Sequence, residues 1–267
     1  MQALQSAFGP YLSDNMWVPA PRYALRRASI LDAMKNKERG EILEVGCATG
    51  ALLSEFADRG FKATGVEMSQ EGRRCADIFS VGSRDMTVLE SPRADWREHF
   101  AYLFSFEVLE HIEDDLEALS RWVDWVKPGG TAVLSVPAHM KLWGATDEYA
   151  GHYRRYSKQQ LQDLMSHAGL VDISIEAYGF PVSNIIEPFR NAHHKRRLKQ
   201  GVADLGMKEA TENSGVDRGL ESRLFPLMTS FPGRQLLELG TKVQRLFRNT
   251  ELGTGWVATG RKPDARD

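Results

Sequence analysis

The sequence has few of the features that mark a secreted or membrane-spanning protein. Only two cysteines, Cys47 and Cys75, occur in 267 residues, which is too few for a disulfide framework. No uninterrupted run of about 18 apolar residues is present, so the sequence predicts no transmembrane segment. The first residues lack the basic start and apolar stretch of a secretory signal. Together these absences predict a cytoplasmic protein.

An excess of charge is absent as well. The 34 basic and 36 acidic residues give a formal charge of −2, so nothing draws the whole chain to nucleic acid, and RNA is not an expected partner. The exceptions are local: residues 189–200 are basic, and residues 223–247 are apolar with two prolines. The basic run alone fits a solvated helix face. Both segments together fit a substrate lid, a homodimer surface or a peripheral membrane contact.

Strand-like and helix-like patterns alternate along most of the chain. Such alternation predicts an α/β protein with helices on both faces of a mostly parallel sheet. We divide the chain into an N-terminal helical cover at 1–40, a core at 41–180 plus 251–263, and a helical insertion at 181–250. Short apolar runs predict the strands, at residues 41–45, 62–68, 86–90, 101–106, 131–137, 171–179 and 255–262.

The first of these strands leads into a glycine-containing turn and then a helix, in "EILEVGCATG". Gly46 and Gly50 let the backbone pass close to a ligand, and the helix start offers free amide donors. Glu67 ends the second strand, where a carboxylate can accept hydrogen bonds from ribose hydroxyls. A dinucleotide fingerprint fails, because Ala48 and Ala51 occupy two of its glycine positions. By itself the turn is also compatible with a tight connection that binds nothing.

Four segments in order, "LEVGCATG", "GVEMS", "VLEHI" and "WVKPGGTAVLSVP", resemble class I S-adenosylmethionine-dependent methyltransferases. The resemblance covers about residues 41–178, with 255–262 as the closing strand. It implies a Rossmann-like, seven-stranded sheet whose last strand is antiparallel, and S-adenosylmethionine as cofactor. It also implies that Glu67 binds the ribose, Met68 lies beside the adenine, and Asp95 contacts the adenine amine. The implied residues around the methionine end of the cofactor are Glu44, Gly46, Cys47, Ala48, Gly50, Phe106 and Glu107.

Two acids and a histidine, Glu107, Glu110 and His111, follow the fourth strand, whose carboxyl end faces the cofactor crevice of such a sheet. In one interpretation Glu110 caps the next helix and His111 bonds a carbonyl. In another, His111 or the distant His152 is a general base. In a third, Glu107, Glu110, His111 and His152 bind a divalent metal such as Mg²⁺. Because Glu110 and His111 are adjacent, they can bind the same metal ion only if the chain bends after the strand.

The metal pattern resembles that of small-RNA 2′-O-methyltransferases and ubiquinone-pathway O-methyltransferases. A second segment, "GHYRRYS" at 151–157, resembles the "GH-x-RRY" segment of bacterial methyltransferases, which implies a small or lipid-linked acceptor. Arg154 and Arg155 can fork onto a substrate carboxylate or phosphate, with Tyr153 beside them. Alternatively, both arginines pair with Asp147 or Glu148.

The sequence therefore predicts methyl transfer from S-adenosylmethionine to an acceptor hydroxyl of a small-molecule, glycan or lipid-linked metabolite. Metal assistance belongs to the third interpretation of the acids and histidines. N- or C-methylation of a small metabolite and RNA 2′-O-methylation are the alternatives.

Overall fold

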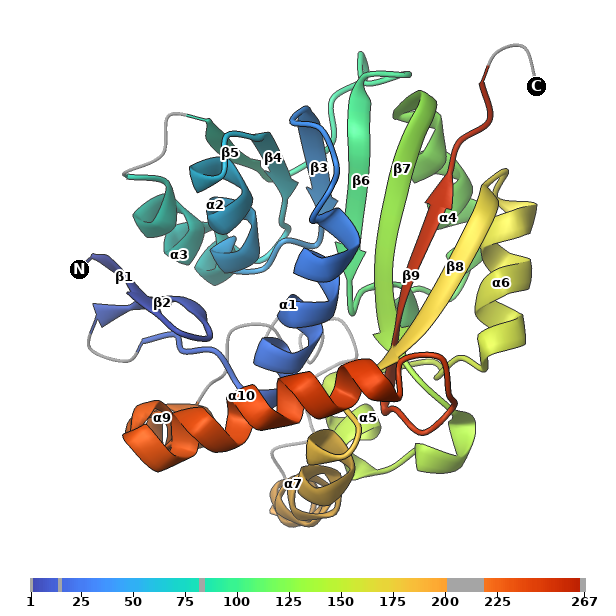
Figure 1. The fold of residues 1–267 in the computed structure, drawn as a ribbon. Coiled ribbons are helices and arrows are strands. Elements are labelled where there is room, and N and C mark those ends of the chain that lie inside the picture. Colours follow the sequence, from blue (N-terminus) through green and yellow to red (C-terminus); the bar gives the residue numbers. More distant parts are fainter. Residues whose placement is uncertain (1, 14–15, 82–84, 201–218, 265–267) are drawn as a thin grey trace.

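The computed structural model describes residues 2–13, 16–81, 85–200 and 219–264 (Figure 1). A seven-stranded sheet lies at its centre, in the order β5-β4-β3-β6-β7-β9-β8. Neighbouring strands are parallel except at β9, which runs antiparallel to β7 and β8. This arrangement confirms the predicted class and the antiparallel last strand. The strands are β3 (Glu41–Val45), β4 (Lys62–Val66), β5 (Met86–Leu89), β6 (Phe100–Phe106), β7 (Val126–Pro137), β8 (Val171–Tyr178) and β9 (Gly255–Arg261).

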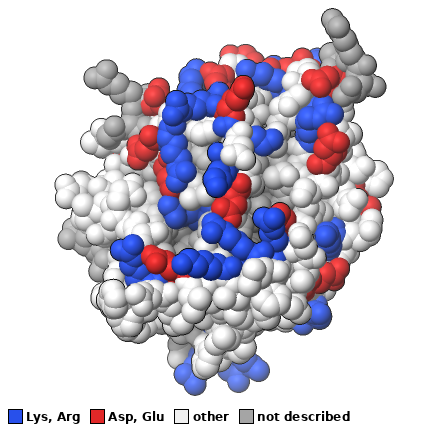
Figure 2. Space-filling view, in the orientation of Figure 1, with Lys and Arg blue, Asp and Glu red and all other residues white. Residues whose placement is uncertain are grey.

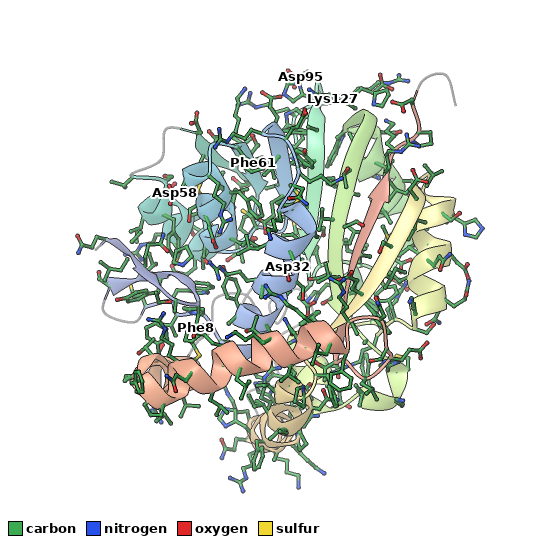
Figure 3. The ribbon with its side chains drawn as sticks, viewed as in Figure 1. Phe8, Asp32, Asp58, Phe61, Asp95 and Lys127 are labelled. Carbon is green, nitrogen blue, oxygen red and sulfur yellow. The ribbon has the colours of Figure 1, made fainter. Side chains whose placement is uncertain are left out.

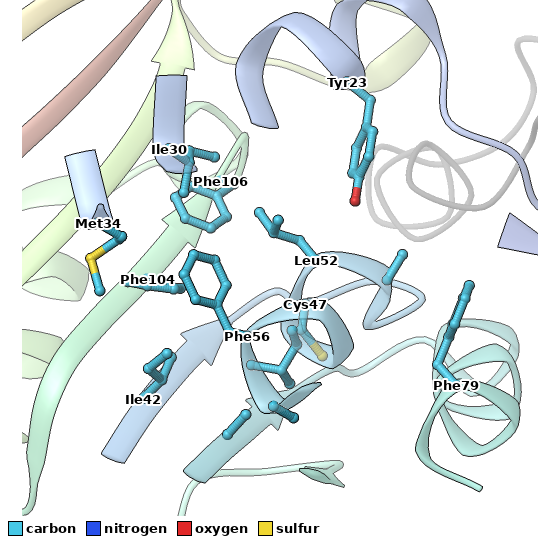
Figure 4. Close-up of a cluster of buried hydrophobic side chains, with 14 of the residues drawn as sticks. Tyr23, Ile30, Met34, Ile42, Cys47, Leu52, Phe56, Phe79, Phe104 and Phe106 are labelled. Carbon is cyan, nitrogen blue, oxygen red and sulfur yellow. The ribbon is translucent and has the colours of Figure 1, made fainter. Parts of the chain in front are cut away.

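Helices cover both faces of the sheet (Figure 1). Successive side chains of a strand point to opposite faces, so each central strand contributes to two cores. Ile42 and Phe104 belong to the cluster under α1, α2 and α3 (Figure 4), and Leu43 and Leu103 to the cluster under α4 and α6. All four side chains are fully buried. The helices are α1 (Pro21–Met34), α2 (Ala51–Asp58), α3 (Gln70–Ser80), α4 (Asp115–Asp124) and α6 (Lys158–His167).

Polar side chains begin several of these helices, as the sequence suggests. The carboxylate of Asp114 accepts a hydrogen bond from the backbone N–H three residues on, at the start of α4. Ser157 and Gln160 form a capping box at the start of α6. The first helix ends at Met34, before the end of the predicted helical cover at residue 40. Each cap satisfies backbone donors that the helix itself leaves unpaired.

Several further elements lie at the edge of the sheet where the parallel strands end (Figure 1). A two-stranded ribbon lies within residues 1–40, where the sequence predicts a helical cover, and the centroid of its Tyr11 ring lies 5.1 Å from that of Phe225. The described residues between β8 and β9 are mostly helical, as predicted. None of the helices in the described ranges is both long and apolar enough to cross a bilayer. The elements are β1 (Ala3–Ser6), β2 (Gly9–Leu12), α5 (Ala145–Ala150), α7 (Val182–Lys199), α9 (Gly219–Thr229) and α10 (Phe231–Leu246).

Truncating the centre of the sheet tests this account of the core. Leu103→Ala removes a side chain that is 0 % exposed in β6, so we expect the free energy of unfolding to fall by about 2–5 kcal/mol. Leu116→Ala, at a side chain that is 39 % exposed in α4, should change it by less than about 1 kcal/mol. Urea unfolding followed by circular dichroism measures both, and equal losses would contradict the assigned core.

Candidate active site

The glycine turn after β3 lies against the end of β6. Gly46 has a φ of +70°, and a Cβ added there would lie 2.5 Å from the Cγ2 atom of Val108. The backbone N–H groups of Gly46 and Cys47 both donate to the carbonyl of Val66, at 2.9 and 3.2 Å. A side chain at position 46 would therefore push the turn away from its two neighbouring strands. The ends of β3, β4 and β6 thus meet at one place.

Glu67 is fixed beside this turn. Its carboxylate accepts hydrogen bonds from the backbone N–H groups of Ala48 and Ser69, both at 2.8 Å. An ionised carboxylate only accepts hydrogen bonds, which is the chemistry that ribose hydroxyls require. Met68, the next residue, is 66 % exposed, which leaves its side chain available to a ligand. The cofactor roles of Glu67 and Met68 stay predictions that this geometry permits.

Asp95 does not lie at this edge of the sheet, and its predicted contact with the adenine amine is wrong. Figure 3 shows it at the opposite edge, next to Lys127, where β6 and β7 begin. Aromatic packing fixes the segment there, since the Trp96 ring lies 5.5 Å from that of Trp125. The residue that directly follows β5 at the ligand edge is Glu90 instead. The role that the family resemblance implies for Asp95 therefore belongs to a different residue of this loop.

Two polar groups that the sequence did not single out as a pair are buried near the turn without partners. The Nε atom of Arg26 and the Oε2 atom of Glu44 have no hydrogen-bond partner. Burial, followed by the charge of Glu67, raises the pKa of Glu44 to about 8. Unsatisfied buried polar groups are costly, so a ligand that bonds them would be stabilising. An amino-acid end, with a carboxylate and an ammonium group, has the complementary chemistry for both.

Glu107 adopts a left-handed backbone, with φ of +59°, and three side chains bond its carboxylate. It accepts hydrogen bonds from Arg22 at 2.7 Å, Tyr178 at 3.1 Å and Ser135 at 3.2 Å. Burial would raise the pKa of Glu107, but the charges of Arg22 and Arg26 outweigh it and lower the pKa to about 2. The carboxylate is therefore ionised and held by the protein. Its predicted role as a metal ligand does not fit these bonds.

The other three predicted metal ligands do come together. Glu110, His111 and His152 each offer one ligand atom, and these atoms all lie within 4.8 Å of one another. A short 3₁₀ turn, Leu109–His111, supplies the bend that the adjacent pair requires. The two imidazole rings are 4.6 Å apart and nearly perpendicular. The described residues thus contain a group of three ligands at this site, and Glu107 is outside it.

The Glu110 side chain is 0 % exposed, and neither carboxylate oxygen has a hydrogen-bond partner. Burial, then the nearby charge of Glu107, raises its pKa well above the usual range. Burial, then the neighbouring His152, lowers the pKa of His111 to about 3, so that imidazole is neutral at pH 7. A neutral imidazole is the form that binds metals.

His152 is held in place through three further side chains. Its Nδ1 lies 2.8 Å from Asp147, whose carboxylate also accepts from Arg155 at 2.7 Å. Arg155 in turn bonds Glu187 of α7 at 3.2 Å. Burial would raise the pKa of Asp147, but the bonds from His152 and Arg155 lower it to about 2. An ionised Asp147 keeps the proton on Nδ1 and leaves Nε2 as an acceptor, 4.0 Å from Glu110.

The arginines of "GHYRRYS" therefore have structural partners. Arg155 is 2 % exposed, so its predicted fork onto a substrate does not fit, and its alternative pairing with Asp147 does. Arg154 bonds Asp115 at 2.8 Å and the carbonyl of Glu113 at 2.6 Å. Tyr153 is 40 % exposed, and its substrate role stays a prediction.

Sequence reasoning missed the residues that surround Glu107. Arg22 and Arg26 lie one turn apart on α1, and this spacing was the available signal that one face of the helix is basic. No such signal marked Tyr178 and Ser135, because both lie within segments that have the pattern of strands. Figure 2 shows the basic side chains of α1 gathered in the middle of this face.

Comparison with known proteins agrees with the resemblance to methyltransferases seen in the sequence. A family model described as "Methyltransferase domain" matches residues 20–175. The ubiquinone biosynthesis O-methyltransferase of Alkalilimnicola ehrlichii is 32 % identical over 117 residues, 42 % of this chain and 47 % of the relative. An uncharacterized methyltransferase of Alkaliphilus oremlandii is 25 % identical over 184 residues, 68 % of this chain and 80 % of the relative. The chain spans about half the length of the ubiquinone-pathway relatives it matches.

Solved structures share the fold. Phosphoethanolamine N-methyltransferase 2 of Haemonchus contortus, in complex with S-adenosyl-L-methionine, has a TM-score of 0.53 at 18 % identity, covering 90 % of this chain and 52 % of that one. The [4+2]-cyclase SpnF has a TM-score of 0.57 at 16 % identity, covering 98 % and 88 %. With the glycine turn, the sheet order and a family match over more than half of its length, the chain belongs to the methyltransferase-domain family of class I S-adenosylmethionine-dependent methyltransferases.

Proposed function

We propose that the protein transfers a methyl group from S-adenosylmethionine to a hydroxyl of a small-molecule, glycan or lipid-linked metabolite. The observation that carries this proposal is the cluster of Glu110, His111 and His152, directly after β6 and next to the glycine turn. These groups can accept a proton or bind a metal. A hydroxyl becomes a good nucleophile when a base removes its proton or a metal lowers its pKa. The ubiquinone-pathway relatives, named as O-methyltransferases, support oxygen as the acceptor atom.

The cofactor fits the residues around the turn. When bound, S-adenosylmethionine supplies an activated methyl group on its sulfonium. Glu67 would hold the ribose hydroxyls, and the unpartnered atoms of Arg26 and Glu44 would bond the carboxylate and ammonium of the methionine end. Gly46 keeps the turn close enough for its backbone to line the same ligand. The chain would thus orient the cofactor at both ends, at the ribose and at the amino acid.

A divalent metal fits the cluster at the end of β6. A fully buried carboxylate without partners is costly on its own, and an ion would satisfy it. Glu110, His111 and His152 would be the ligands, and a bound ion would lower the pKa of the acceptor hydroxyl. Two imidazoles and one carboxylate favour a first-row transition ion or Zn²⁺ over Mg²⁺, which prefers oxygen ligands.

His152 has the orientation of a general base even without a metal. Asp147 fixes its tautomer, so Nε2 can take the acceptor proton while the acceptor oxygen bonds the methyl carbon and the bond from that carbon to the sulfonium sulfur breaks, leaving a neutral thioether. An amine acceptor, as in the names of the N-methyltransferase structures, can react in its neutral form and needs no such base. A buried acid beside two imidazoles therefore favours a hydroxyl acceptor. A net charge of −2 disfavours RNA.

Cofactor binding tests the first part of the proposal. We expect Glu67→Ala to weaken S-adenosylmethionine binding about tenfold to a hundredfold, because charge-assisted hydrogen bonds to the ribose are lost. Asp95→Ala, at the opposite edge of the sheet, should leave the affinity unchanged. Isothermal titration calorimetry measures both, with thermal melting as the check of folding. Wild-type affinity in a folded Glu67→Ala protein would contradict the assigned cofactor site.

Metal content tests the second part. We expect Glu110→Gln to lower the bound metal per chain, measured by inductively coupled plasma mass spectrometry after loading with Zn²⁺ or Mn²⁺, and to lower the methylation rate about 10–100-fold. The affinity for S-adenosylmethionine should stay unchanged. His167→Ala, at an exposed histidine that ends α6, is the control. Unchanged metal content and full activity after chelation would leave His152 as a base acting without a metal.

A further inference from the structure

The helices between β8 and β9 carry an exposed apolar surface. Fifteen large apolar side chains are exposed in the described chain, and eight of them lie on α7, α9 and α10. Single exposed apolar residues are normal, but a cluster marks an interaction site. We call this cluster the apolar surface; it comprises Ile185, Phe189, Leu224, Leu227, Phe231, Leu236, Leu239 and Leu246.

The pattern along α10 shows why these side chains stay outside. Leu237 and Gly240 are buried against the protein. Leu236, Leu239 and Leu246 recur at spacings that place them on one neighbouring face of the helix, and they are 67, 56 and 79 % exposed. One helix therefore has two apolar faces, of which only one is covered. A helix that only packs on the core needs one apolar face, so the second face is not explained by the fold.

The apolar surface continues from α10 onto α7. The two helices touch where a Cβ on Gly240 would lie 2.5 Å from a methyl group of Val182. Ile185 and Phe189 follow Val182 by three and seven residues, so they share its face of α7. Their side chains are 64 and 74 % exposed. The exposed leucines of α10 and these two residues thus flank one helix contact.

Positive charge surrounds the apolar surface. Between 182 and 199 and between 222 and 248, ten residues are basic and two are acidic. Four of the ten form ion pairs: Arg190 with Glu187, Arg234 with Glu238, Arg245 with Asp32 and Arg248 with Glu176. With these four acids counted, the basic residues still outnumber the acidic ones. This local excess contrasts with the net charge of −2 for the whole chain. Figure 2 shows the pale lower part of this face bordered by blue groups above and below. The basic residues are Arg190, Lys195, Arg196, Arg197, Lys199, Arg223, Arg234, Lys242, Arg245 and Arg248.

We propose that the apolar surface and its basic border bind a membrane containing anionic lipids. Leucine and phenylalanine side chains enter the acyl boundary while the lysines and arginines contact the headgroups. A second copy of this chain is a poorer occupant, because a two-fold interface would bring two surfaces of the same sign together. RNA would use the basic residues but would leave the aliphatic side chains in water.

The position of the apolar surface links membrane binding to the reaction. Helix α10 bonds α1 through Gln244 and the Leu25 carbonyl and through Arg245 and Asp32. The same α1 carries Arg22, which holds Glu107 at the active site. A membrane at α10 would therefore lie beside the cover of the site, where a lipid-linked acceptor would enter. This role rests on the proposed function, whereas membrane binding itself does not.

Vesicle sedimentation tests the binding without any reaction. We expect the full chain to bind phosphatidylcholine vesicles that contain about 30 % phosphatidylglycerol, to bind pure phosphatidylcholine weakly, and to be released as salt rises. Leu239→Glu should lower the partition coefficient at least about tenfold, because a leucine that the membrane would bury is replaced by a charge. Gln235→Glu adds the same charge on an exposed neighbouring position and should lower it less than about threefold.

Four results would overturn the proposal. They are failure of the wild type to bind anionic vesicles, equal effects of Leu239→Glu and Gln235→Glu, a concentration-dependent dimer in light scattering that Leu239→Glu dissociates, and tighter binding to single-stranded RNA than to vesicles. Both substituted positions are exposed, and circular dichroism verifies the fold of each variant. Because binding is scored without substrate, its loss is distinguishable from failure of the proposed methyl transfer.

Discussion

The ion pair between Arg22 and Glu107 is the contact on which the site depends. Glu107 ends β6 in a left-handed conformation that costs free energy in a residue other than glycine. Hydrogen bonds from Arg22, Ser135 and Tyr178 hold it there, and these come from α1, β7 and β8. The turn after Glu107 then presses Val108 against Gly46 and turns Glu110 inward. The cofactor turn and the proposed catalytic cluster are thus positioned by one carboxylate.

The sequence predicted the layers well because burial in a parallel sheet leaves a clear pattern. Apolar runs such as 41–45 are buried on both faces, and the glycine turn after them has few alternative conformations. The predictions failed where a loop has no such pattern. Between 90 and 100, nothing in the sequence fixed which residue meets the ligand edge, and Asp95 was assigned to the wrong side. The ribbon at β1 and β2 packs against elements far away in sequence, such as α2, α3 and the Phe225 ring of α9, which local sequence does not reveal.

The side chains of the site were predicted only in part for a related reason. Glu110, His111 and His152 converge as their spacing suggested. Glu107 and Arg155 carry the same chemical groups, yet each is occupied by partners from elements far away in sequence. Charge alone does not distinguish a ligand from a structural ion pair; the partners decide. The fold does not decide the chemistry either, since the similar structures include proteins described as an N-methyltransferase and as a [4+2]-cyclase.

The bond between Arg155 and Glu187 has a consequence for how such proteins diversify. Glu187 belongs to α7, outside the sheet, yet it is the last member of a chain that ends at the ring of His152. The orientation of that imidazole therefore depends on a helix whose other surface faces away from the reaction. A chimera that replaces α7 through α10 by the corresponding segment of another methyltransferase would alter the reacting centre itself. The inserted helices and the core would have to be exchanged together for the chemistry to survive.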